Sequence, residues 1–138
     1  MIQRIQTLYL ILVAVLMGIF MSSPLYSELA EENIVPGSSP MELATVGLAV
    51  LILLVSLGTV VLFKNRPLQT KLTGLLLVLH VALIALCAVV VLPVLSQTET
   101  YSIGFGTILP VISLILAGLA LRGIKKDEKL VRGADRLR

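Results

Sequence analysis

Four long apolar runs dominate this chain and restrict it to a small set of folds. They cover residues 5–25, 41–63, 72–95 and 103–121, and each has between 19 and 24 residues. A helix needs about 20 mostly apolar residues to cross the hydrocarbon core of a bilayer. Within that core the backbone hydrogen bonds must be made inside the segment, which favours a helix. The sequence therefore predicts four membrane-spanning helices.

The composition excludes a soluble enzyme domain. Hydrophobic residues make up 57% of the chain and charged residues 14%, with a mean hydropathy of +1.03. Soluble domains have about 45–50% apolar and about 25% charged residues. One cysteine, Cys87, allows neither an internal disulfide nor a metal site built from several cysteines.

The intervals between the runs determine how the helices are connected. They contain 15, 8 and 7 residues, so we expect consecutive helices to be antiparallel. The first run is too long for a signal-peptide core, and Pro24 followed by Leu25 disfavours a cleavage site, so we expect that helix to be retained. The predicted fold is all-α, with a four-helix membrane domain at residues 1–121 and a basic tail at 122–138.

Prolines and glycines predict where the helices begin and bend. Residues 39–42, Ser-Pro-Met-Glu, resemble a capping box with proline in the first turn, and Pro67 can start the third helix early. Pro110 lies inside the fourth run and would free the carbonyl of Gly106. With Gly104 nearby, the beginning of the fourth helix is predicted to be kinked or loosened.

The charges predict the topology. The first, third and fifth hydrophilic segments hold one, three and seven of the 11 lysines and arginines, which is all of them. The other two segments carry only acidic residues among their charges. By the positive-inside rule, both termini face the cytoplasm. We expect a multi-pass protein of the bacterial inner membrane.

Both ends of the chain and its middle loop carry a family resemblance. Residues 1–10, MIQRIQTLYL, and 124–132, IKKDEKLVR, resemble a family of small four-helix inner-membrane proteins from Bacteroidota and their relatives, and the 65–69 turn, NRPLQ, is similar to that family's basic middle loop. The family is catalogued only as a domain of unknown function. The resemblance implies a fold and a location, and it implies no activity.

His80 is the candidate for chemistry inside the membrane, because an ionisable group there is a functional hypothesis by default. It lies eight residues, about 12 Å, into the third run at a rise of 1.5 Å per residue. The same depth in the neighbouring runs brings Ser56, Thr59 and Ser113 to its level. These residues predict one polar layer, which either joins helices by hydrogen bonds or forms a quinone, proton or haem site.

The tail is a second candidate, for contact with lipid or with a partner. Its basic residues are Lys125, Lys126, Lys129, Arg132 and Arg136, among others. An apolar stripe, which includes Leu130, predicts that the tail is helical for most of its length. That helix either continues from the fourth run or turns at Gly123 onto the membrane surface. The alternatives are a stop-transfer signal, a segment that binds anionic lipid, and a docking site for a cytoplasmic partner.

The residues favour a structural role. The runs contain no carboxylate apart from Glu42 at the edge of the second, which disfavours a proton-coupled exporter, and Cys87 has no second cysteine for thiol redox chemistry. We expect an accessory or assembly subunit of a larger membrane complex, or a homo-oligomer, without metal, cofactor or nucleic acid. The alternative is a small transporter or quinone-linked redox subunit organised around His80, so an enzymatic role stays open.

Overall fold

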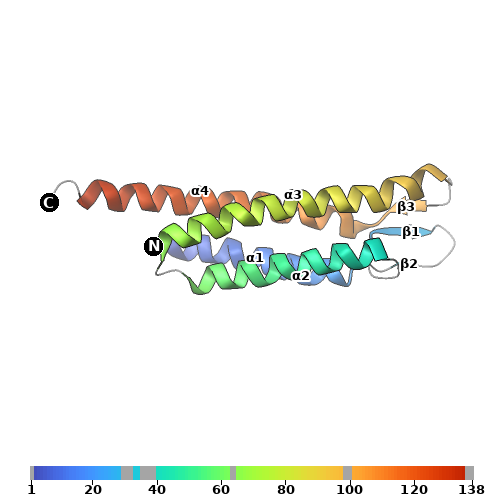
Figure 1. Ribbon diagram of the computed structural model, residues 1–138, viewed down its shortest axis with the longest axis horizontal. Coiled ribbons are helices and arrows are strands. Elements are labelled where there is room, and N and C mark those ends of the chain that lie inside the picture. The colour runs from blue at the N-terminus through green and yellow to red at the C-terminus, as the bar shows by residue number, and fades with distance from the viewer. Residues whose placement is uncertain (1, 29–32, 35–39, 63–64, 98–100, 136–138) are drawn as a thin grey trace.

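The computed structural model describes residues 2–28, 33–34, 40–62, 65–97 and 101–135, and it is dominated by four long helices (Figure 1). They are α1 (Ile2–Met21), α2 (Pro40–Val61), α3 (Arg66–Gln97) and α4 (Leu109–Asp135). The chain runs up and down the bundle, so that its two ends lie toward the same end of the molecule. The predicted all-α bundle with antiparallel neighbours is confirmed.

Three segments of the described part are long and apolar enough to cross a membrane. They are Pro40–Val61, Arg66–Pro93 and Phe105–Leu130, and α1 contributes a shorter apolar stretch, Ile5–Met21. Many large apolar side chains point outward, for example Leu54 at 59% exposed and Val78 at 65%. In water such a surface would be unfavourable, whereas lipid accepts it. The chain is therefore a membrane protein.

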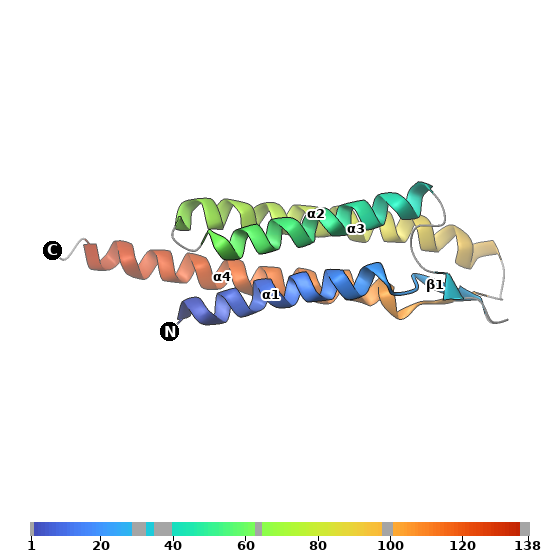
Figure 2. The same ribbon diagram turned by 90° about the horizontal axis from the view of Figure 1, so that it is seen from below.

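The helices pack in a ring in which α1 lies between α2 and α4, and α3 closes the opposite side (Figures 1 and 2). Large side chains of α1, such as Met17 and Phe20, fill the centre. Helix α4 presents Ser113, Ala117 and Ala120 to that centre, all at 0% exposed. Small residues at this spacing let helix backbones approach closely, which is how membrane helices gain packing energy.

The helix starts follow the prolines. Helix α2 begins at Pro40 and α3 at Arg66, one residue before Pro67. A proline in the first turn costs no hydrogen bond, because its missing N–H would be unpaired there. Ser39, the expected capping residue, lies outside the described residues. Helix α3 continues through Pro93 to Gln97, so the third helix is longer than the predicted 72–95.

The end of the bundle away from the termini carries a small sheet that the sequence analysis did not predict. Strand β1 (Tyr26–Glu28) pairs antiparallel with β2 (Asn33–Ile34) on one side and with β3 (Tyr101–Ile103) on the other. Next to it, Gly104 N–H donates to the Leu25 carbonyl at 2.9 Å and Gly106 N–H to the Pro24 carbonyl at 3.0 Å. We call the segments 23–28 and 101–107 together the clasp.

The clasp corrects two of the predicted spans. The first helix ends at Met21 rather than at 25, because the chain turns at Ser22–Ser23 before Pro24. The fourth α-helix begins at Leu109 rather than at 103, after a 3-10 turn, η1 (Phe105–Ile108). The predicted loosening before Pro110 is confirmed. The Gly106 carbonyl is not free, however, because it accepts a hydrogen bond from the Leu109 N–H.

Helix α4 continues without a break beyond the apolar run, and its last turns project past the other three helices (Figure 2). The expected boundary between residues 121 and 122 therefore falls inside a helix. The part from Arg122 to Asp135 is about 20 Å long at 1.5 Å per residue. The predicted helical tail is confirmed to Asp135, and of the two predicted paths it takes the straight one rather than turning at Gly123.

Candidate polar layer and basic end

His80 of α3 lies in the interior of the bundle, at 0% exposed. Its Nδ1 is 2.6 Å from the Leu76 carbonyl oxygen and its Nε2 is 2.8 Å from Ser113 Oγ on α4. A carbonyl oxygen can only accept, so Nδ1 carries the proton and donates to it. In the neutral imidazole, Nε2 then accepts from the Ser113 hydroxyl. Both ring nitrogens are thereby engaged within the chain.

Ser56 and Thr59 of α2 are also at 0% exposed, but their hydroxyl groups bond within their own helix. Ser56 Oγ donates to the Leu53 carbonyl at 2.8 Å, and Thr59 Oγ1 to the Val55 carbonyl at 2.7 Å. Of the four residues that the sequence places in one layer, the structure brings His80 and Ser113 into direct contact. The two hydroxyl groups of α2 satisfy themselves locally, as serine and threonine in helices often do.

A second polar contact joins helices nearer the termini, and the sequence analysis missed it. Gln69 of α3 is 6% exposed, and its Nε2 donates to the Thr59 carbonyl of α2 at 3.3 Å. Thr73 Oγ1 in turn donates to the Gln69 carbonyl at 2.8 Å. Gln69, Thr73 and His80 are spaced by four and seven residues, which places them on one helix face. That spacing is the feature of the sequence from which a shared polar face on α3 could have been predicted.

Gln6 of α1 is another buried polar residue that the sequence analysis did not identify. Its side chain is 4% exposed, and the Nε2 atom has no hydrogen-bond partner among the described residues. It packs against α4 at Gly123, where an added Cβ would lie 2.9 Å from Gln6 Cγ. Gly123 thus provides the space that this amide occupies.

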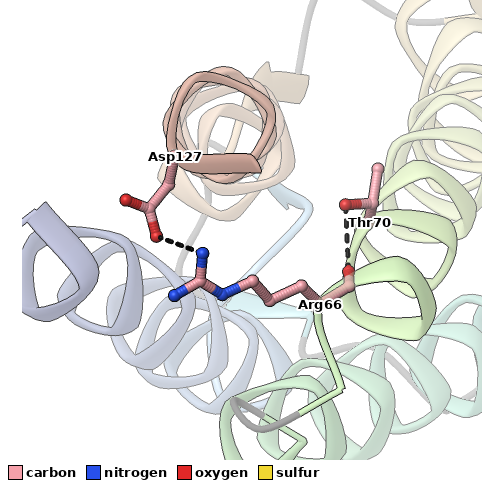
Figure 3. Close-up of polar contacts among 3 residues, drawn as sticks. All are labelled: Arg66, Thr70 and Asp127. Atoms are coloured by element: carbon pink, nitrogen blue, oxygen red, sulfur yellow. Dashed lines mark hydrogen bonds and ion pairs between the residues drawn. The ribbon is translucent and has the colours of Figure 1, made fainter. Parts of the chain in front are cut away.

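We call the end where α3 begins and α4 projects the basic end. There Arg66 reaches across to α4 (Figure 3), with its Nη1 3.6 Å from Asp127 Oδ2. Thr70 Oγ1 donates to the Arg66 carbonyl at 3.1 Å. The Nη1 atom is buried and has no hydrogen-bond partner among the described residues, so at 3.6 Å the contact is an ion pair without a hydrogen bond.

Four of the five predicted contact residues of the tail belong to α4. Lys125, Lys126 and Lys129 are exposed. Lys125 and Lys129 line a groove of about 330 Å³ together with Thr70 and Glu128, whereas Lys126 does not. Arg132 belongs to α4, but its side chain lies outside the described part, as does all of Arg136.

Two further residue types bear on chemistry in the membrane. Glu42, expected as a capping residue, lies in the first turn of α2 and is 2% exposed, and its carbonyl accepts from Thr45 Oγ1 at 2.7 Å. A carboxylate at a helix N-terminus is stabilised by the helix dipole.

Cys87 is a buried free thiol. The described residues contain no group of three or more His, Cys, Asp or Glu side chains that could hold a metal ion.

Comparison with known proteins gives one match. A family model described as a domain of unknown function (DUF4293) matches residues 2–137. Neither a curated protein nor a solved structure matches the chain.

Proposed function

The chain belongs to the DUF4293 family of domains of unknown function, which the match establishes over nearly its whole length, and we propose that it is a non-catalytic accessory or assembly subunit of a larger membrane complex. In this proposal the protein lies in the bacterial inner membrane with both termini in the cytoplasm. The distribution of the 11 lysines and arginines supports that orientation.

The observation that carries the proposal is the continuity of α4. Ala117, Ala120 and Ile124 are buried against the other helices, and the same helix then extends to Asp135 beyond them (Figure 2). A helix anchored in a packed bundle presents its free part in a fixed direction. A protruding basic helix is suited to docking a partner at the membrane surface.

The interior supports a structural role for the polar layer. His80 donates to the Leu76 carbonyl of its own helix through Nδ1 and accepts from Ser113 of α4 through Nε2, so both nitrogens are engaged and the second bond holds α3 against α4. A hydrogen bond of this kind between membrane helices contributes about 0.6–1.7 kcal/mol. This arrangement favours helix packing over a quinone or proton site at His80.

The test is purification of the full-length chain from its own cells in mild detergent, followed by quantification of the co-purifying proteins. We expect one or more membrane proteins at a constant molar ratio. Replacing Lys126, Arg132 and Arg136 with glutamate reverses the charge of the tail and is expected to remove them. Ser113→Ala, which alters the interior, serves as the control and should retain them.

Two outcomes would contradict the proposal. One is a monodisperse chain without any protein at constant ratio. The other is a stoichiometric quinone or haem that is lost on replacing His80 with asparagine, which would indicate the redox subunit instead.

A further inference from the structure

The groove at the basic end combines positive charge with a position at the edge of the apolar part of the bundle. Lys125 and Lys129 lie one helical turn apart on α4, and Thr70 faces them from the first turns of α3. The apolar runs begin at Leu72 and end at Leu121, within a turn or so of Thr70 and Lys125. This is the level at which lipid phosphates lie, at the edge of the hydrocarbon core.

The seam between α3 and α4 continues from the groove into the membrane part. Gly74 is one turn from Thr70, and Gly118 is two turns from Lys125. Both glycines are half-buried, and a Cβ added at either one would meet nothing within 4 Å. The absence of side chains at these two positions leaves room along the seam next to the basic groove.

A second cavity lies on the same seam, farther from the basic end. It has a volume of about 200 Å³ and lies between Ile84 and Ala88 of α3 and Val111 of α4, with Cys87 among its lining residues. Residues 70, 74, 77, 81, 84 and 88 follow one another in steps of three and four, so they lie along one face of α3. The seam therefore begins at the basic groove and leads along α3 to the apolar cavity.

We propose that this seam binds an anionic phospholipid, with its phosphate at Lys125 and Lys129, beside Thr70, and an acyl chain running past Gly74 and Gly118. Two lysines and Glu128 give the groove a net charge of +1, which matches one phosphodiester. The chemistry recognised is a phosphate oxyanion attached to an apolar chain. The proposal is independent of any protein partner of the tail.

The experiment uses the full-length protein in a non-ionic detergent and native mass spectrometry. The probes are dioleoylphosphatidylglycerol, dioleoylphosphatidylcholine and inorganic phosphate. We expect the protein to retain phosphatidylglycerol in preference to phosphatidylcholine. We also expect that inorganic phosphate does not displace the phosphatidylglycerol. A basic residue near a membrane surface attracts anionic lipid by about 1 kcal/mol, which is about fivefold in affinity.

The charge variants locate the site. Replacing Lys125 and Lys129 with glutamine should weaken retention of the anionic lipid by about 25-fold. Lys126→Gln removes the same kind of charge from the same helix outside the groove, so it should change retention less than twofold. A loss of about fivefold in Lys126→Gln, the same loss per lysine as in the double variant, would show that the tail attracts anionic lipid by its overall charge, and would overturn the groove as the site.

A steric variant tests the acyl chain without a change of charge. Gly118→Leu fills the seam and should reduce retention of the anionic lipid, whereas Gly58→Leu, at another open glycine on α2, should not. Unchanged retention in Gly118→Leu would exclude the seam as the chain's location. Displacement of the lipid by inorganic phosphate would indicate a site for a free anion. Equal retention of the two lipids would show that the lysines do not select an anionic headgroup and would favour a protein partner for them. Either outcome would overturn the proposal.

Discussion

At the scale of single residues, the buried polar groups differ in whether their partners lie on another helix. His80 and Ser113 bond across α3 and α4, whereas Ser56 donates to a carbonyl of its own helix. A bond across helices contributes to tertiary stability, while a bond within a helix is retained when the helices separate. Removing the hydroxyl group of Ser113 or of Ser56 therefore compares a bond between helices with a bond within one helix.

Ser113→Ala should lower the free energy of unfolding by about 0.6–1.7 kcal/mol, because His80 Nε2 loses its donor. Ser56→Ala should lower it by less, since its partner is the Leu53 carbonyl of the same helix. Reversible unfolding in bicelles measures both. A double-mutant cycle with His80→Phe should show coupling of the same size, and additive effects would contradict a direct bond.

Gln6 allows the opposite prediction, an increase in stability. Its amide is buried and its Nε2 has no partner among the described residues, and leaving such a donor unpaired costs about 1–3 kcal/mol. Gln6→Met keeps the shape of the side chain and should raise the free energy of unfolding by about 1 kcal/mol. Gln69→Met, which removes the contact with Thr59, should lower it. Equal destabilisation by both changes would show that Gln6 has an acceptor after all.

At the scale of elements, the clasp ties the end of α1 to the start of α4. Its hydrogen bonds run from Gly104 and Gly106 to the carbonyls of Leu25 and Pro24, and Thr107 Oγ1 also donates to the Leu25 carbonyl at 2.8 Å. A Cβ on either glycine would collide with the Pro24 carbonyl oxygen. Only glycine lets the two backbones approach this closely.

Gly106→Ala should therefore destabilise the fold by about 1–3 kcal/mol, the usual cost of overpacking. Gly58→Ala, in the interior of α2 with nothing within 4 Å of the added Cβ, should be neutral or stabilising by up to about 1 kcal/mol. Thermal unfolding in detergent distinguishes the two. An unchanged transition in Gly106→Ala would mean that the clasp contributes no stability.

The helices could be predicted from the sequence and the clasp could not. A run of about 20 apolar residues has few alternatives in a bilayer, and prolines 40 and 67 fix two helix starts. Strands of two or three residues carry no readable period, and the pairing of Tyr26 with Ile103 joins positions far apart in the chain. The sequence relates Gly104 and Gly106 to Pro110, whereas in the structure their role depends on the Pro24 carbonyl.

The polar contacts were predictable to the extent that depth determines them. Counting residues from the membrane edge placed His80 and Ser113 at one level, and they lie 2.8 Å apart. Depth alone does not determine rotation about the helix axis. For that reason Ser56 and Thr59 share the level without bonding to His80, and Gln6 was not recognised as buried.

At the scale of the whole molecule, the charge distribution predicts the orientation in the membrane. In a chain whose Cys87 is replaced by serine, a cysteine introduced at Ser38 should react with an impermeant thiol reagent from outside the cell. Lys126→Cys, at an exposed position on the tail, should react only after permeabilisation. The opposite pattern of labelling would place the termini outside.

Because α4 is one continuous helix, its packing in the bundle fixes the direction in which each tail residue points around the helix axis. We call this direction the azimuth. One alanine inserted after Gly123 would rotate every later residue by 100° and advance it by 1.5 Å. Lys125 and Lys129 would then turn away from Thr70, and Asp127 from Arg66. Seven inserted residues, about two turns, would restore the azimuth while moving the lysines about 10 Å farther from the membrane. The lipid site needs the lysines at the right azimuth and at the level of the lipid phosphates, so both insertions should abolish it. A docking face for a protein partner needs the azimuth alone, so the seven-residue insertion should retain it.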